Sequence, residues 1–241
     1  MATVTNQHVN LFAQYCLNNL NLGTIQYSAG YKSLSTCILD CIYSLRSHYY
    51  NCTVPVVDRY ASKYMNGDRF APNDSLNNLL KNIELEGGYV NFANNLLKNR
   101  QVLNGELKSK VCYNLAIKLI SIGINSLYDF QTYKSVDLLE ETILSVKGVG
   151  LAALNYLFML AGDPNRCKPD VHIHRCVKSA IGCDLTDSEC QDLFSQVIVI
   201  LNNKYPQLTI RQLDYTIWEI FQAKKISQQK ISKKGTSQKN P

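Results

Sequence analysis

Residues 146–175 read VKGVGLAALNYLFMLAGDPNRCKPDVHIHR, and this stretch decides which fold the sequence predicts. A short turn, Lys147-Gly148-Val149-Gly150, separates two apolar segments within it. Glycine adopts positive φ at no steric cost, so the turn suits a tight connection between two helices. Such a turn exposes main-chain N–H groups at the start of the second helix, where a phosphate oxygen binds without any side chain. Taken alone, the turn is explained more simply by a plain helix–helix connection.

An aspartate follows this turn at a defined distance. Asp170 lies twenty positions after Gly150, beyond a second apolar helix predicted at 151–161 and an irregular stretch at 162–168. Because Pro169 suits the start of a helix, we expect Asp170 in the first turn of a third one. A carboxylate at that place either caps the helix or takes part in chemistry.

Helical periodicity with start and stop signals recurs along the chain, and strand signals are nearly absent. The sequence therefore predicts an all-α protein whose two helical lobes enclose a cleft. Two capping boxes, Thr186 with Glu189 and Thr209 with Gln212, mark the starts of the last helices. The other expected helices cover residues 5–20, 34–48, 55–64, 74–87, 89–98, 106–122, 136–146 and 151–161.

The expected lobes differ in how the chain builds them. Residues 1–28 and 165–223 form one lobe from the two chain ends, and residues 29–164 form the central lobe with the two-glycine turn. Residues 224–241 hold six lysines and no acid, which predicts a disordered basic tail. The tail accounts for the whole formal charge of +6, so the charge of the body says little about a nucleic-acid partner.

Composition also bounds the compartment and the cofactors. No stretch reaches the roughly 20 apolar residues of a membrane helix, and Met1–Asn10 lacks the apolar core of a signal peptide. We therefore expect a cytoplasmic protein with no membrane contact. The nine cysteines form no Cys-x-x-Cys pair, which favours reduced, buried thiols over a metal site or any other cofactor.

The turn and the aspartate together resemble the helix-hairpin-helix DNA glycosylase superfamily, which includes endonuclease III and the adenine and alkyl-base glycosylases. In that family a Leu-Pro-Gly-Val-Gly-like hairpin precedes Val-Asp-x-His-x-x-Arg at this same distance. The matching residues here are Val146–Gly150 and Pro169–Arg175, within an overlap that covers Val136–Val177. Ser109-Lys110-Val111 and Tyr43–Ser47 are weaker matches to two upstream family segments.

The resemblance implies a monofunctional DNA glycosylase, which hydrolyses the N-glycosidic bond of a damaged or modified base and leaves an abasic site. Asp170 would be the catalytic carboxylate that stabilises positive charge on the deoxyribose. Ala152 occupies the position of the lysine that gives other members lyase activity, and the cysteine cluster of an iron–sulfur centre is missing. The expected role is base-excision repair or defence against modified phage DNA.

The expected partner is double-stranded DNA with a flipped base, bound by a monomer. By family position Arg46 fills the gap in the base stack, although Tyr43 is equally well explained as core and residues 48–50 as a surface turn. Trp218 is expected in the core and Asp214 in a structural ion pair. The candidate DNA contacts are Lys147, Gly148, Val149, Gly150, Lys168, His174, Arg175, Ser109 and Lys110, and the base-pocket candidates are Arg46, Tyr43, His48, Tyr50, Asn99 and Arg100.

Two other functions fit the same residues. A noncatalytic DNA-binding protein would keep the hairpin and lack the chemistry, and a weaker alternative is a role on RNA, since main-chain amides bind any phosphate backbone. A looser resemblance, to an uncharacterised bacterial group related to these glycosylases, implies no activity. It rests on Val57–Tyr60, Asn99–Gln101, Lys168–Asp170, His174-Arg175, and Leu213–Tyr215 with Ile217–Glu219.

Overall fold

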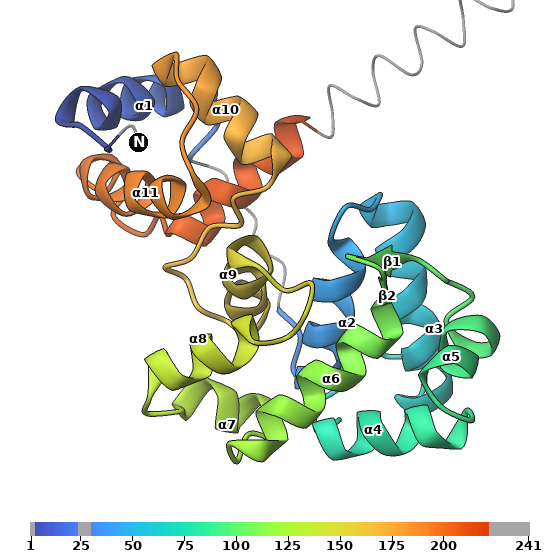
Figure 1. Ribbon diagram of the computed structural model, residues 1–241. Helices are drawn as coiled ribbons and strands as arrows, with labels where there is room; N and C mark the ends of the chain where they lie inside the picture. Colours follow the sequence, from blue (N-terminus) through green and yellow to red (C-terminus); the bar gives the residue numbers. More distant parts are fainter. Residues whose placement is uncertain (1–2, 24–29, 222–241) are drawn as a thin grey trace, which may run out of the picture. The chain divides into compact units, whose positions relative to one another are not determined.

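The computed structural model describes residues 3–23 and 30–221, and helices dominate them (Figure 1). This confirms the expected all-α fold. The chain divides into two compact units, Met1–Tyr27 with Pro164–Pro241 (unit 1) and Ser28–Asp163 (unit 2), where the expected boundaries are 28/29 and 164/165. The expected basic tail at 224–241 lies outside the described residues.

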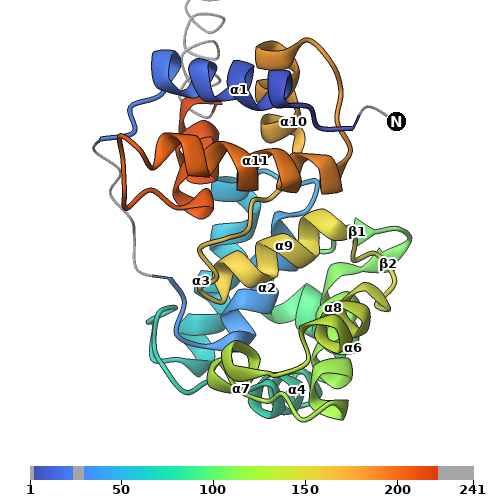
Figure 2. The same ribbon diagram turned by 90° about the vertical axis from the view of Figure 1, so that its left-hand side faces the viewer.

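Unit 1 is built by helices from both ends of the chain. Helices α1 (Asn6–Asn19), α10 (Val171–Ile181) and α11 (Asp187–Leu201) pack on one another, and residues 210–221 are also helical. Figure 2 shows α1 and α11 side by side. Both expected capping boxes are present, because the hydroxyls of Thr186 and Thr209 accept the N–H groups three residues on. The core holds Phe12, Cys16, Ile173, Cys176, Phe194, Val197 and Leu213.

Unit 2 surrounds helix α2 (Leu34–Ser44), in which every residue is buried. Helices α6 (Lys108–Ser121) and α9 (Leu151–Leu160) pack against it. A helix enclosed on all sides needs side chains that are apolar or hydrogen-bonded all round, and the sequence of α2 meets this need. The other elements are η1 (Tyr49–Thr53), α3 (Val54–Tyr64), α4 (Leu76–Leu85), α5 (Tyr89–Asn91), η2 (Phe92–Leu96), β1 (Val102–Leu103), β2 (Glu106–Leu107), α7 (Leu127–Thr132) and α8 (Val136–Leu144).

Several expected helices have different bounds, and the one expected at 89–98 is the short helix α5 followed by the π-helical turn η2. Two further differences have a clear local cause. The helix expected at 34–48 ends at Ser44, because Arg46 takes the left-handed φ of 52° and a π-helical turn, η1, follows. The helix expected at 106–122 starts only at Lys108, since Glu106 belongs to a small β-hairpin with Val102 and Leu103. Its turn, Asn104-Gly105, has positive φ at both residues, which such hairpins require.

A buried carboxylate links α2 to its neighbours. Asp40 is fully buried and accepts hydrogen bonds from the hydroxyls of Tyr31 at 2.7 Å, Tyr49 at 2.8 Å and Tyr156 at 2.9 Å. Burying a charge is costly unless hydrogen bonds compensate for the lost water, and these tyrosines do so. Asp40 therefore ties α2 to both η1 and α9.

Candidate functional site

The two-glycine turn connects α8 to α9 as expected. Gly148 has a φ of 96°, and the N–H of Val149 donates to the carbonyl of Val146 at 3.0 Å. Gly150 is the N-cap of α9. Because glycine has no side chain, no N-cap side chain accepts the first N–H groups of this helix. A Cβ on Gly150 would meet nothing within 4 Å, whereas one on Gly148 would lie 3.2 Å from Leu103. The turn therefore packs on β1 and is open at Gly150.

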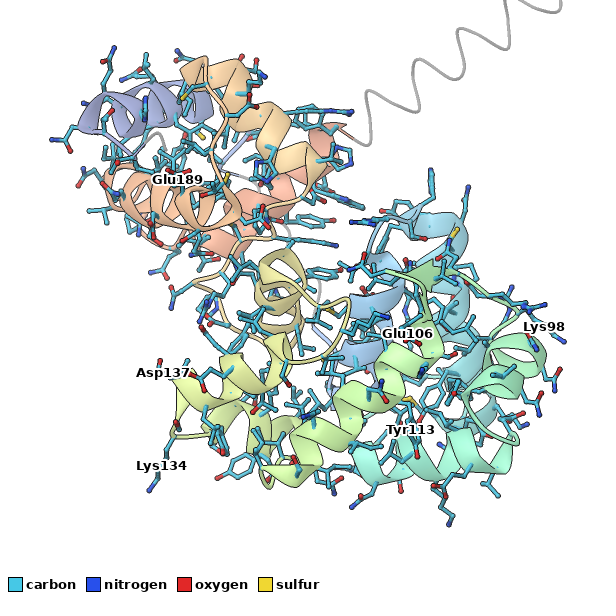
Figure 3. All side chains as sticks on the ribbon, viewed as in Figure 1. Lys98, Glu106, Tyr113, Lys134, Asp137 and Glu189 are labelled. Carbon is cyan, nitrogen blue, oxygen red and sulfur yellow. The ribbon has the colours of Figure 1, made fainter. Side chains whose placement is uncertain are left out.

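Two expected lysine contacts lie beside this turn. The carboxylate of Glu106 pairs with the ammonium of Lys147 at 3.3 Å and with that of Lys110 at 2.7 Å (Figure 3 labels Glu106). Ser109 is fully buried on the inner face of α6, so its side chain is a wrong choice for a DNA contact. Val149 is also buried and offers its main chain only.

A buried lysine, which the sequence reasoning missed, joins two loops of the expected base-pocket region. The ammonium of Lys108 donates to the carbonyls of Tyr43 at 3.0 Å and Leu45 at 2.6 Å, and to Oε1 of Gln101 at 2.9 Å. The hydroxyl of Ser47 also donates to Oε1 of Gln101, at 3.1 Å. Lys108 thus fixes the loop that carries Arg46 next to the loop that carries Asn99 and Arg100.

The base-pocket candidates separate into core and surface. Tyr43 is fully buried in α2, and burial raises the pKa of its hydroxyl, so its choice as a base contact is wrong. Asn99 is half-buried and accepts the N–H of Gln101 at 3.0 Å, which gives it a role in loop structure. His48 is half-buried as well, and Arg46, Tyr50 and Arg100 are exposed on unit 2.

Asp170 lies in unit 1 and caps α10. The helix begins two residues later than the start expected at Pro169, at Val171, and Oδ1 of Asp170 accepts the N–H groups of His172 at 2.8 Å and Ile173 at 3.3 Å. The expectation of Asp170 inside the first turn is therefore wrong, because the extended backbone of Asp170 makes it the N-cap. Within the described ranges no hydrogen bond reaches the other oxygen, Oδ2.

A second carboxyl group lies beside Asp170. Asp214 is 7% exposed, and its Oδ2 accepts the N–H of Lys168 at 2.8 Å, while the carbonyl of Lys168 accepts the N–H of Asp170 at 2.6 Å. Burial, and then the negative charge of Asp170, raise the pKa of Asp214 to about 8. The expectation that Asp214 forms a structural ion pair stays a prediction; the positive charges of Lys168 and Arg211 lie close enough to oppose the rise of its pKa. Only the fold brings these two residues together.

The helix that carries Asp214 also presents aromatic rings. Tyr215 and Trp218 stack with ring centroids 6.0 Å apart and an interplanar angle of 26°. Trp218 is half-buried, so its expected place in the core stays a prediction. The ring of His172 lies 5.5 Å from that of Phe221 on the same helix. Aromatic faces therefore occur in unit 1 on the helix of Asp214.

The remaining candidates of unit 1 are Lys168, His174 and Arg175. Lys168 is half-buried and Arg175 is exposed. His174 is partly exposed, and its Nε2 lies 2.9 Å from Oδ1 of Asp187. Its Nδ1 lies 3.6 Å from the thiol of Cys190, which gives the order of a cysteine–histidine–aspartate triad. Burial, and then Asp187, raise the pKa of that buried thiol to about 12, which disfavours the thiolate that a nucleophile needs.

No group of three histidine, cysteine or acidic side chains in the described part of the chain has metal-binding geometry. None of its helices combines the length and the apolar composition that spanning a membrane requires. A surface hollow of about 420 Å³ is lined by residues 123, 129 and 132–135, where Asp129 is engaged as a cap of α7.

These features define an all-α protein of two units, with a two-glycine hairpin in one and a helix-capping aspartate in the other. The chain belongs to the DUF8548 family, described as a domain of unknown function, whose model matches residues 11–222. No curated protein and no solved structure matches the chain.

Proposed function

We propose that this protein is a monofunctional DNA glycosylase that hydrolyses the N-glycosidic bond of a damaged or modified base. The observation that carries the proposal is the carboxylate of Asp170. It caps α10 through Oδ1 and leaves Oδ2 without a hydrogen bond among the described residues. The two hydrogen bonds to Oδ1 fix the orientation of the carboxylate. Its other oxygen, Oδ2, can then stabilise a cationic transition state electrostatically.

The reaction needs only water and the DNA strand. The bond between the base nitrogen and C1′ breaks with its electron pair on the base, and the positive charge that develops on the sugar is stabilised by Asp170. Water adds to C1′ and gives its proton to Asp170 as general base, which releases it to solvent, while the departing base takes up a proton from solvent. No amine at position 152 is present to form a Schiff base, so the product is an abasic site in an intact strand.

The hairpin supports DNA as the partner. Gly150 leaves the start of α9 uncovered by a side chain, and Lys147 beside it is 66% exposed. Main-chain N–H groups with a neighbouring ammonium suit a phosphate oxygen. The same features of the hairpin would serve a noncatalytic DNA-binding protein, which is the second candidate. Its support is that Asp170 caps α10, a structural role that needs no catalysis.

The deciding experiment incubates the protein with duplexes that carry different modified bases and then treats them with alkali. We expect alkali-labile sites with at least one base, and their loss in Asp170→Asn. Asparagine caps a helix as well as aspartate does, so this variant keeps the fold. If no base gives such sites, or if Asp170→Asn cleaves as the wild type does, catalysis by Asp170 is excluded. Competition with RNA of the same sequence tests the partner.

A further inference from the structure

Glu106 uses both oxygens of its carboxylate on lysines that flank the two-glycine turn. Oε1 lies 3.3 Å from the ammonium of Lys147, and Oε2 lies 2.7 Å from that of Lys110. The side chain of Glu106 is only 24% exposed, whereas that of Lys147 is 66% exposed. In the absence of DNA, Lys147 and Lys110 therefore both form ion pairs with the carboxylate of Glu106.

The backbone fixes this carboxylate next to the turn. Glu106 pairs with Leu103 across the β-hairpin, and Leu103 in turn packs against Gly148. The closest approach of Leu103 to a Cβ built on Gly148 is 3.2 Å, so the two elements are in contact. Figures 1 and 2 agree in placing β1 and β2 beside the connection between α8 and α9. Glu106 is thus anchored beside the proposed phosphate site.

We propose that Glu106 is an internal competitor of DNA phosphate: it holds Lys147 and Lys110 in ion pairs that a bound strand must replace. This inference rests on the proposed function, because it assumes that the partner of the hairpin is DNA. A carboxylate and a phosphate offer an ammonium the same kind of oxygen acceptor, so the gain from each new phosphate contact is offset by a broken pair. Duplex DNA without a modified base then binds weakly, and stable capture depends on contacts to the extruded nucleotide.

The carboxylate of Glu106 is ionised at neutral pH. Hydrogen bonds from Lys110 and then from Lys147 lower the pKa of Glu106, and the same contact with Glu106 raises the pKa of Lys110. Both partners are ionised at neutral pH, where DNA binding would be measured. Neutralising the carboxylate therefore requires a substitution rather than a change of pH.

The test compares the affinity of the full-length wild type and Glu106→Gln for a short unmodified duplex by fluorescence anisotropy. We expect the variant to bind about twofold to thirtyfold more tightly, the range that two exposed ion pairs span. In a Lys147→Met background the gain from Glu106→Gln should shrink, because one of the two competing pairs is already absent.

Asp58→Asn is the matched control. It removes one carboxylate from an exposed pair with Arg69 at 3.0 Å and changes the net charge by the same amount. If this control tightens binding as much as Glu106→Gln does, the effect is one of bulk charge and the inference is wrong. If Glu106→Gln weakens binding, Glu106 organises the lysines for DNA and the inference is wrong as well. If neither the wild type nor any variant binds DNA, both the proposed function and the inference about Glu106 are wrong.

Discussion

Oδ1 of Asp170 caps α10, and Oδ2 makes no hydrogen bond among the described residues, so a pair of substitutions can separate the cap from the proposed catalysis. Asp170→Asn keeps an acceptor for the N–H groups of His172 and Ile173, so we expect an unchanged melting temperature and a loss of cleavage. Asp170→Ala should lose cleavage and also about 1 kcal/mol of stability. Thermal unfolding and the alkali assay on both variants check this. A large loss of stability in Asp170→Asn would show that the carboxylate itself is structural.

Asp214 makes the stability of the protein depend on pH. Its pKa is raised to about 8, so between its ordinary value near 4 and this value the folded state binds more protons than the unfolded state. The contribution of Asp214 to the free energy of unfolding therefore falls as the pH rises from about 4 to about 8. We expect Asp214→Asn to lose less stability than the wild type over this interval in urea unfolding. Asp58→Asn, an exposed control, should keep the wild-type dependence, and equal slopes in all three proteins would contradict the assignment.

Lys108 shows how one side chain can hold two segments in place. Its ammonium donates to the carbonyls of Tyr43 and Leu45 at the C-terminal end of α2 and to the side chain of Gln101. Lys108→Met would leave these acceptors buried without a donor, and we expect a loss of about 2 kcal/mol or more. Lys110→Met, on the same helix but in an exposed ion pair, should cost less than about 1 kcal/mol. Chemical denaturation of both variants measures the difference, and equal losses would exclude a special role for Lys108.

The backbone conformation of the loop after α2 is set by tertiary contacts rather than by the conformational preferences of its own residues. Arg46 has a left-handed backbone without the freedom of glycine, and such a conformation persists only where the surroundings determine it. Lys108 bonds to the carbonyl of Leu45 on one side, and Asp40 accepts the hydroxyl of Tyr49 on the other. The exposed side chain of Arg46 is therefore presented from a constrained turn, as a gap-filling residue would need.

Each of the two units has a hydrophobic core of its own. Unit 2 is continuous in sequence from Ser28 to Asp163, so we expect a fragment of these residues to keep helical circular dichroism and to melt cooperatively. Unit 1 needs both chain ends, because Phe12 of α1 packs against Phe194 of α11 with ring centroids 5.3 Å apart. Removing α1 should therefore expose the core of unit 1 and cause aggregation. An unfolded fragment 28–163 would show that its core does not suffice.

The sequence predicts those features of local structure that depend only on neighbouring residues. A capping box such as Thr186 with Glu189, the proline at the start of α3 and the glycine turn at 147–150 each act over about four residues, so their chemistry is written in consecutive positions. The same locality explains why the all-α class and most helix starts were predicted. The bounds shifted where a neighbour in space intervened, as at Arg46 and Glu106.

The sequence by itself determined the helical class, the glycine turn, Asp170 and the absence of a lysine at position 152. Only the tertiary structure decided which side chains meet: Ser109 and Tyr43 are buried, Glu106 lies between Lys147 and Lys110, and Asp214 lies beside Asp170. The physical reason is that burial and most of these contacts depend on residues about 40 to 65 positions away, which helix periodicity does not encode. The pair of Glu106 with Lys110 is the exception, since these residues are four positions apart.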